Sequence, residues 1–484
     1  MTASDHGPQL SLIEAIIPIA SLIVLVGLSY YLFGDAGANG PSQVALIVAT
    51  MITVLVARYR GHTLESLNEA AVASVSSGVG AIFILFAVGA LIGTWALSGT
   101  LVAMVYYGMK VLHPSYFYVS AAAICAIVSA GIGSSWTVAG TIGIGLMGIS
   151  HSMELNPAIT AAAIISGAYF GDTASPLSDS ANLAAAAAGV DLYDHVRETA
   201  MTSAAALAIA LIVFWMLGRP GEFDASEKMI AIERAFHISP ILFLPLVVVA
   251  ALALLKFPPF TAVFAGALAG GVLALWVAPE RVIAFAQAGD GMPKWLALIK
   301  GIWLALAGGY SSNTGYAPID QLSSRGGMAS MLNTIWLVMA ALAFGGVAEK
   351  AGVLERLIRP IIAAAKSAVA LTTSLVGAVI TTSAVTADQY MAVVLPGRMF
   401  KRAFPEKGFA AVALSRAVGA SATPTSALIP WNSCGAYMAA TLGVATFDYA
   451  PYAAFNLASP LLIIASSYLG VRMLRMPEVQ EQVS

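Results

Sequence analysis

The stretch GAYFGDTASPLSDSANL, residues 167–183, decides how this sequence is interpreted. It contains two aspartates, Asp172 and Asp179, together with three serines and Pro176, and apolar sequence lies on both sides of it. An ionised carboxylate at the centre of a membrane helix costs roughly 2.5–3.5 kcal/mol, and a proline interrupts the helical hydrogen bonds. The stretch therefore predicts a broken helix whose charge serves a function.

The composition is that of a membrane protein. Of 484 residues, 59% are hydrophobic and only 10% are charged, against about 25% charged in soluble domains. The mean hydropathy is +0.85. Apolar runs close to the length of a bilayer crossing recur at 12–33, 44–56, 204–217, 238–255 and 261–277. We expect an all-α polytopic protein embedded in a lipid bilayer, and we interpret the first run as the first spanning helix rather than a cleaved signal.

Several other classes are excluded by missing motifs. No basic cluster interleaved with aromatic residues indicates nucleic-acid binding, and no catalytic or phosphate-binding motif indicates an enzyme. The two cysteines, Cys125 and Cys434, lie in apolar surroundings and are expected to be small core residues. We expect no cofactor and no transition-metal site.

The chain resembles itself in two halves. Aligning 158–183 with 409–434 places Asp172 opposite Thr423 and Ser175 opposite Ser426, an offset of 251 residues. Upstream, residues 93–101 match 346–354 at nearly the same offset. The predicted segments are an N-terminal tail (1–9), repeat 1 (10–218, hairpin tip about 131–137, broken helix about 172–176), an aqueous linker (219–237), repeat 2 (238–478, insertion about 279–328, hairpin tip about 383–389, broken helix about 423–427) and a C-terminal tail (479–484).

The distribution of positive charge predicts that the two repeats are inverted. The loop 396–408 holds four lysines and arginines, whereas its counterpart 148–157 holds none. Loops rich in lysine and arginine stay on the cytoplasmic side, so equivalent loops that differ in this way face opposite sides. Inverted repeats are typical of secondary transporters, which bind their substrate between the repeats near the middle of the membrane.

Three carboxylates lie far from any aqueous loop, namely Asp172, Asp179 and Asp388. We predict that they bind a cation or a proton. Hydroxyl and amide groups at both breaks and both hairpin tips would supply further oxygen ligands for Na⁺. Two alternatives remain: Arg398 or Arg416 could pair with the carboxylates, and the hydroxyls could serve helix–helix hydrogen bonding. His195, within the polar run DLYDHVRE, is expected to be solvated.

Longer segments resemble the NhaC-type sodium/proton antiporter family of the ion transporter superfamily. They include GAYFGDTASPLSDSANLAAAAAGVDLYDHVRE, VTADQYMAVVLPGRMF and LIPWNSCGAYMAATLGVATFDYAPYAAFNL, and the resemblance covers nearly the whole chain. It implies a scaffold domain, a mobile transport domain with two re-entrant hairpins and two broken helices, elevator-type movement, a homodimer and a multi-pass position in a bacterial plasma membrane. The chain departs from the family at Gly419 and Ala420, where an acidic pair is usual, and at Thr173, where a lysine is usual.

The resemblance also implies where sodium would bind. One site would lie near Ser134, Ser135, Thr137, Asp172 and Ser175, and a second near Thr386, Asp388, Thr423, Thr425 and Ser426. Thr173, Asn182 and Asn432 are further predicted ligands.

The first hypothesis is Na⁺/H⁺ antiport by alternating access, in which Asp172 and Asp388 bind Na⁺ and H⁺ in turn and Asp179 assists. The alternative is a Na⁺-coupled carrier of a small organic acid or amino acid, contacted by Trp136 and Trp431. A passive cation channel is a third, weaker possibility.

Overall fold

The computed structural model describes residues 10–34, 37, 40–218, 226–289, 291–312, 320, 324–365 and 367–470. The regular elements within these residues are helices, and eight of them are long and apolar enough to cross a membrane. They are Leu12–Phe33, Pro41–Tyr59, Val79–Ser98, Pro114–Ile132, Leu192–Met216, Pro259–Val277, Met328–Lys350 and Ala368–Thr386. The prediction of a polytopic α-helical membrane protein is confirmed. Both predicted tails lie outside the described residues.

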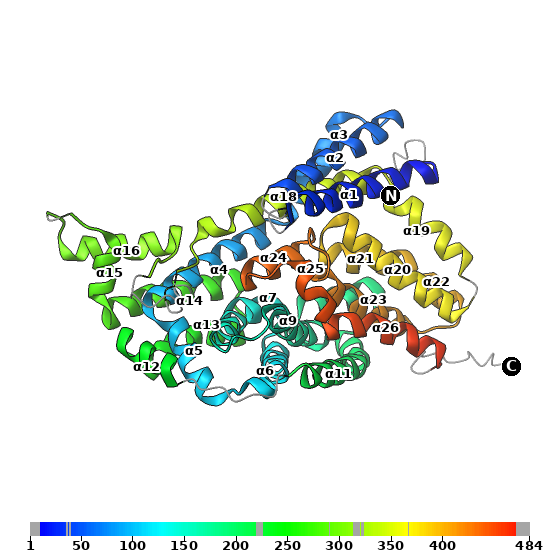
Figure 1. Ribbon diagram of the computed structural model, residues 1–484. Coiled ribbons are helices and arrows are strands. Elements are labelled where there is room, and N and C mark those ends of the chain that lie inside the picture. The colour runs from blue at the N-terminus through cyan, green and yellow to red at the C-terminus, as the bar shows by residue number, and fades with distance from the viewer. Residues whose placement is uncertain are drawn as a thin grey trace.

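One layer of the molecule is built from the first helices and a helix from the second half. α1 (Leu12–Phe33) packs on α2 (Pro41–Tyr59), and α18 (Leu332–Lys350) packs on α2 and on α3 (Leu64–Ser77). This layer lies at the top of Figure 1, with α19 (Val353–Ala364) at its end.

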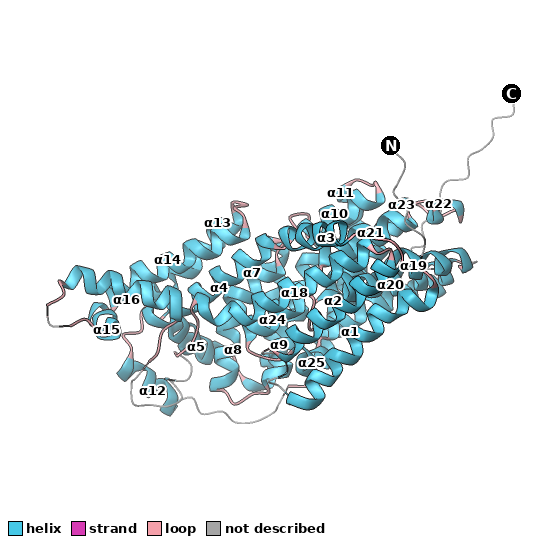
Figure 2. Cartoon of the chain, turned by 90° about the horizontal axis from the view of Figure 1, so that it is seen from above, coloured by secondary structure: helices cyan, strands magenta, loops and turns pink. Residues whose placement is uncertain are grey.

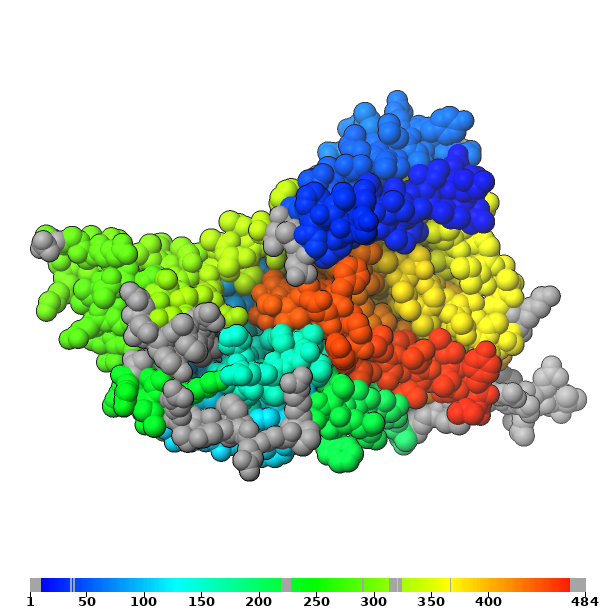
Figure 3. Space-filling view, viewed as in Figure 1, coloured from blue at the N-terminus to red at the C-terminus, as the bar shows by residue number. Residues whose placement is uncertain are grey.

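A second group surrounds α4 (Val79–Ser98). It packs on α14 (Pro259–Val277) and α16 (Lys294–Gly308), and α13 (Leu244–Leu254) packs on α14. The buried indole of Trp95 donates to the Gly266 carbonyl oxygen at 3.1 Å and ties α4 to α14. The predicted insertion contains α15 (Pro279–Ala286) and α16, which project from the body in Figures 1 and 3. Residues 313–319 and 321–323 of it lie outside the described residues.

The remaining helices form the centre. From the first half come α6 (Phe117–Ile132), α7 (Ser135–Val138), α8 (Ile144–Ser152), α9 (Pro157–Ala174), α10 (Asp179–Ala188) and α11 (Leu192–Met216). From the second come α20 (Ala368–Thr386), α21 (Gln389–Phe400), α23 (Ala411–Ser426), α24 (Ser433–Leu442) and α26 (Ala454–Tyr468). The two sets are interleaved, because α26 packs on α9 and α11, and α10 packs on α21 and α23, beside which it lies in Figure 2.

Short elements complete the described part of the chain. They are α5 (Thr100–Val111), α12 (Ser226–Ala235), α22 (Ala403–Glu406), α25 (Thr446–Tyr449) and four 3₁₀ turns at Pro114–Tyr116, Pro240–Phe243, Met328–Met331 and Ala450–Tyr452. A π-helical turn, Ala139–Gly143, joins α7 to α8 without a break. The predicted linker 219–237 therefore includes a helix, and its residues 219–225 lie outside the described part.

The outer and inner helices bury different residues. Trp215, Trp276 and Trp303 expose 68%, 76% and 71% of their surface on outward-facing helices, as expected where lipid replaces water. In contrast, α9 carries a run of alanines and glycines that is buried on nearly every side. Small residues allow helices in a membrane to approach closely, so α9 occupies the crowded centre.

Close packing of α9 on α6 fixes the position of Asp172. A Cβ atom added at Gly167 would lie 2.2 Å from the Ala122 carbonyl oxygen, and one at Gly171 would lie 2.1 Å from the carbonyl carbon of Ser129. Any larger residue at either position would push the two helices apart. Asp172 follows Gly171 directly and is thereby held beside the end of α6.

The breaks lie slightly later than the sequence indicated. α9 continues through Ala174, and its hydrogen bonding stops at Ser175, which is extended because it precedes Pro176. The gap before α10 thus spans 175–178, and Asp172 itself is helical. In the second half, α23 runs through Pro424 to Ser426, and the gap before α24 spans 427–432.

Candidate functional site

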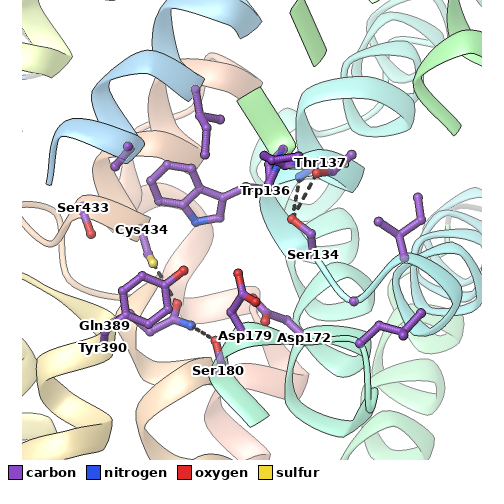
Figure 4. A pocket seen from close by; sticks show the side chains of 18 of the residues that line it. Ser134, Trp136, Thr137, Asp172, Asp179, Ser180, Gln389, Tyr390, Ser433 and Cys434 are labelled. Carbon is purple, nitrogen blue, oxygen red and sulfur yellow. Dashed lines mark hydrogen bonds between the residues drawn. The ribbon is translucent and has the colours of Figure 1, made fainter. Parts of the chain in front are cut away.

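A cavity of about 640 Å³ lies where the hairpin tips and the broken helices meet. Its polar lining comes from four helix starts: Ser134 and Thr137 at α7, Asp179 and Ser180 at α10, Asp388 and Gln389 at α21, and Ser433 and Cys434 at α24. Asp172, Asn182, Trp136 and Tyr390 complete this part of the wall. In Figure 4, Asp172 and Asp179 lie next to each other, with Gln389 and Tyr390 on the facing side.

The first hairpin tip is shaped by a glycine. Gly133 ends α6 with a φ of +78°, and a Cβ atom there would lie 2.6 Å from the carbonyl carbon of Leu177. Only glycine combines this conformation with such close contact. The tip therefore touches the first break. Ser134 then caps α7, with its hydroxyl accepting a hydrogen bond from the Thr137 backbone N–H at 3.3 Å.

Asp172 is held by hydroxyl groups from the tip and from the break. The Ser135 hydroxyl donates to its Oδ2 at 2.6 Å, and the Ser178 hydroxyl donates to its Oδ1 at 2.8 Å. Asp172 is 7% exposed. Its hydrogen-bond donors are neutral hydroxyl groups from two segments that are separate in the sequence.

The second hairpin tip is built differently. Ala387, with a φ of +55°, ends α20, and its carbonyl oxygen accepts from the Ser433 backbone N–H at 2.9 Å, which ties the tip to the start of α24. Asp388 caps α21: its Oδ1 accepts from the Met391 backbone N–H at 2.7 Å. The group that reaches across to the second break is Gln389, whose Oε1 accepts from Ser426 at 3.0 Å.

None of the three carboxylates forms an ion pair with a lysine or arginine in the part of the chain that the structure describes. The ion pairs found there join Arg60 to Glu14, Lys228 to Glu154 and Arg359 to Glu355. The described residues therefore do not include the alternative ion pair of Arg398 or Arg416 with Asp172 or Asp388.

Seven of the predicted residues line the cavity: Asp172, Asp179, Asp388, Ser134, Thr137, Asn182 and Trp136. Ser135 lies just behind the wall, bonded to Asp172. The other predicted ligands point elsewhere, and most of them bond to backbone carbonyl oxygens. These are Thr173 (to Tyr169, 2.7 Å), Ser175 (to Ala130, 2.9 Å), Thr386 (to Thr382, 2.9 Å), Thr425 (to Ser421, 2.6 Å), Ser426 (to Thr423, 2.7 Å, as well as to Gln389), Asn432 (to Ser383, 3.0 Å) and Trp431 (to Ala384, 2.7 Å).

The second predicted sodium site is consequently not assembled around Asp388. Thr423 is buried, and its hydroxyl has no hydrogen-bond partner among the described residues. Most of the other predicted Ser and Thr residues bond to carbonyl oxygens of their own or a neighbouring helix. These contacts match the alternative in which the hydroxyl groups serve helix–helix hydrogen bonding.

The lining also contains residues that were not predicted from the sequence, among them Gln389, Tyr390, Ser433, Cys434 and Lys256. Gln389 and Tyr390 directly follow Asp388, so their place at the hairpin tip was a usable signal. The expectation for His195 is wrong. Its side chain is fully buried, Ser415 hydrogen-bonds to its Nδ1, and a Cβ atom at Gly419 would lie 2.9 Å from its ring.

Comparison with known proteins agrees with the segments quoted from the sequence. The profile of the Na⁺/H⁺ antiporter family matches residues 9–214 and 167–471. The Na⁺/H⁺ antiporter NhaC of Alkalihalophilus pseudofirmus is 35% identical over 89% of this chain and 90% of its own. The arginine/ornithine antiporter ArcD of Halobacterium salinarum is 33% identical, over 95% of this chain and 92% of its own.

A third relative broadens the range of cargo. The malate-2H⁺/Na⁺-lactate antiporter of Bacillus subtilis is 31% identical over 95% of both chains. These relatives are transporters, in keeping with the eight apolar helices. The resemblance noted from the sequence is confirmed, and the chain is a multi-pass membrane protein that belongs to the Na⁺/H⁺ antiporter family.

Proposed function

We propose that the protein exchanges Na⁺ for H⁺ across the plasma membrane by alternating access, and that Asp172 is the group for which the two cations compete. The observation that carries the proposal is the environment of this carboxylate. It is buried at a cavity, it accepts hydrogen bonds from Ser135 and Ser178, and it has no basic partner among the described residues. A carboxylate in such a place is stabilised by a bound cation or by protonation.

The cavity carries more negative than positive side chains. Three carboxylates line it, whereas Lys256 is the one basic residue of its described lining. The starts of α7, α10, α21 and α24 also line it, and helix N-termini stabilise negative charge nearby. The excess of carboxylates favours a bound cation, and Na⁺ and the proton compete for the same group on Asp172.

Exchange follows from this competition. A proton on Asp172 removes the charge that Na⁺ requires, and Na⁺ on Asp172 removes the site for the proton. If the empty, charged site crosses the membrane slowly and the neutralised site crosses quickly, each passage carries one cation or the other. Asp179 and Asp388 line the same cavity and would hold the cation as it enters and leaves.

We further propose inverted repeats, an elevator movement and a homodimer. Support for the repeats comes from the element order, because α6, α7, α9 and α10 are matched in sequence by α20, α21, α23 and α24. In this proposal the central helices move against α1–α5, α13–α16 and α18. Cysteine pairs placed between α4 and α24 should cross-link in one state only, and crosslinking in native membranes should give a dimer band.

The test of the proposed function is transport in proteoliposomes loaded with a pH-sensitive dye. An inward Na⁺ gradient should alkalinise the lumen, and the effect should disappear without Na⁺. Unitary currents in a planar bilayer would instead indicate a channel. An Asp172→Asn variant that still moves protons at the wild-type rate would contradict the proposed role of Asp172.

A second function on the same fold is carriage of a small organic acid or amino acid with Na⁺. The observation that favours it is the size of the cavity, since about 640 Å³ far exceeds the volume of one ion. Trp136 and Tyr390 offer aromatic surface, and Lys256 offers a positive charge on the wall. Na⁺-dependent uptake of a labelled organic acid or amino acid with no pH signal would favour this function over Na⁺/H⁺ exchange.

A further inference from the structure

A second cavity, of about 320 Å³, lies at the far end of two segments that line the first. α24 starts at the first cavity with Ser433 and reaches the second with Leu442. The segment formed by α7 and α8 likewise leads from Ser134 at the first cavity to His151 at the second. The ten residues of α24 rise about 15 Å, so the two cavities lie well apart along the central helices.

A stacked aromatic pair separates the two cavities. The rings of Trp136 on α7 and Tyr437 on α24 lie nearly parallel with their centroids 4.0 Å apart, and the Tyr437 hydroxyl donates to the Trp136 carbonyl oxygen at 2.7 Å. A Cβ atom added at Gly140 would lie 2.6 Å from that hydroxyl oxygen, so the packing around the pair is close. The second cavity is therefore a site of its own and not an extension of the first.

The second cavity differs from the first in the sign of its charge. Its described lining contains Arg325 and His151 but no aspartate or glutamate, and the other described lining residues are apolar or glycine. Glu154, which follows α8, forms an ion pair with Lys228 at 2.8 Å and does not line the cavity. The first cavity, in contrast, is lined by three carboxylates.

Backbone packing holds Arg325 against α4. Two glycines follow it in the sequence, and the Gly327 N–H donates to the Gly89 carbonyl oxygen on α4 at 2.7 Å. A Cβ atom added at Gly326 would lie 2.3 Å from the Gly93 backbone nitrogen. Such close contact between two backbones fixes the point from which the Arg325 side chain extends.

The guanidinium group of Arg325 lacks an acceptor. The side chain is half-buried, and none of the described residues forms an ion pair with it or accepts a hydrogen bond from it. Its Nη2 would lie 3.8 Å from a Cβ atom added at Gly443, where the C-terminal end of α24 carries partial negative charge. No carbonyl oxygen of that end accepts from it, so capping of α24 does not satisfy its five N–H donors. Burial lowers the pKa of the Arg325 guanidinium, as expected for a cation with no compensating anion.

We propose that the second cavity binds a small oxyanion, with Arg325 as its main ligand and the imidazole of His151 as a second donor. The planar fork of a guanidinium matches the two oxygens of a carboxylate, which it binds through two parallel hydrogen bonds. The apolar side chains of Met147 and Leu442 on the wall would accommodate a short carbon chain. The phosphate of a lipid head group presents the same chemistry as a soluble carboxylate. This inference does not depend on the proposed Na⁺/H⁺ exchange.

The experiment measures thermal unfolding of the purified protein in detergent without Na⁺, over increasing concentrations of choline acetate, choline succinate and inorganic phosphate. Choline chloride at equal ionic strength is the reference. The oxyanions should raise the melting temperature in a saturable way, and chloride should raise it less, because it cannot accept two parallel hydrogen bonds. In Arg325→Gln the concentration for half of the maximal shift should be about tenfold higher or more, and in His151→Gln about threefold higher.

Lys256→Gln is the matched control. Lys256 is the basic residue in the described lining of the first cavity, so its replacement removes a positive charge there and leaves the second cavity intact. The variant should need the wild-type concentration of acetate for half of the maximal shift. If Arg325→Gln does not fold, Arg325→Lys takes its place; it keeps the charge but loses the planar fork and should need about three times the wild-type concentration.

Nanodiscs distinguish the two sources of the oxyanion. The titration with acetate is repeated in phosphatidylcholine discs with and without phosphatidylglycerol. If phosphatidylglycerol raises the acetate concentration that the wild type needs, and leaves Arg325→Gln unchanged, the lipid phosphate occupies the site. If it has no effect, the ligand is a soluble anion. Either result supports an oxyanion site on Arg325.

Three outcomes would overturn the inference. The first is a wild-type dependence on acetate in Arg325→Gln and Arg325→Lys. The second is a dependence that is lost in Lys256→Gln instead, which would assign the anion to the first cavity. The third is a wild-type protein that acetate, succinate and phosphate stabilise no more than chloride does.

Discussion

At each of the two breaks that border the cavity, a hairpin tip meets a broken helix, but the side chains that connect them differ in charge. At the first, a hairpin tip and a broken helix meet around the carboxylate of Asp172, which accepts from Ser135 and Ser178. At the second, they meet around the amide of Gln389, which accepts from Ser426 and Cys434. A carboxylate therefore forms the contacts between tip and broken helix at the first break, whereas a neutral amide forms them at the second, where Asp388 caps α21 instead. In the proposed function, cation binding centres on the first half.

Removing the charge of Asp172 should have the largest effect on transport. Asp172→Asn should reduce Na⁺-driven proton movement by about 100-fold or more, because the amide can neither release a proton nor balance Na⁺. Thr423→Val is the matched change at the aligned position of the second half. It should stay within about twofold, since that hydroxyl has no partner among the residues described. The rates are read from dye-loaded proteoliposomes, and equal losses in the two variants would show that the halves contribute alike.

Varying the pH tests the competition itself. When Asp172 is mostly protonated, each further unit of acidification should raise the KM for Na⁺ by up to about tenfold, because a proton must leave before Na⁺ binds. In the alkaline range the KM should become independent of pH. A KM that stays constant from acid to alkaline pH, measured from initial rates, would argue against a shared site.

Removing one hydroxyl group at each break compares how much the two breaks contribute to the KM for Na⁺. Ser135→Ala removes a hydrogen bond to a charged group, and a loss of about 1.5 kcal/mol corresponds to roughly a tenfold higher KM for Na⁺. Ser426→Ala removes a bond between neutral groups and should change the KM by about threefold or less. The ranking would be wrong if Ser426→Ala had the larger effect on KM.

The last prediction concerns stability rather than transport, and it tests the packing that holds Asp172 in place. Gly171→Ala introduces a methyl group against the backbone of Ser129 and should lower the free energy of unfolding by about 1–3 kcal/mol. Gly131→Ala, on the neighbouring helix α6, is the control because nothing lies within 4 Å of its added Cβ atom. Thermal unfolding in detergent measures both, and similar melting temperatures would contradict the proposed tight contact.

Much of this arrangement could be predicted from the sequence because charge is rare in the chain. Asp172 and its hydroxyl neighbours stood out against apolar flanks, and the proline located the first break to within one turn. The second break was predicted too early, at about 423–427, since α23 continues through Pro424 to Ser426. Pro424 cannot donate to the Ala420 carbonyl oxygen, and the Ser459 hydroxyl on α26 donates to that oxygen at 2.6 Å instead.

The uncharged hydrogen-bond network around Gln389 could not be predicted from the rarity of charge in the chain. Gln389 carries no charge, and its place beside Asp388 does not reveal its partners, because Ser180 lies 209 residues away in the sequence. Cys434 was expected to be a core residue. It is buried, as expected, and it also lines the cavity. His195 sits in a polar run, yet α11 packs this position against α23, where Gly419 leaves room for the ring.

Proton release on Na⁺ binding tests the central claim most directly. Purified protein in weakly buffered solution is mixed with Na⁺ at a pH where Asp172 is mostly protonated, and a pH dye reports the protons set free. We predict close to one proton released per Na⁺ bound in the wild type and none in Asp172→Asn. Release that is undiminished in Asp172→Asn, or Na⁺ binding to the wild type with no release across the whole pH range, would contradict competition at this carboxylate.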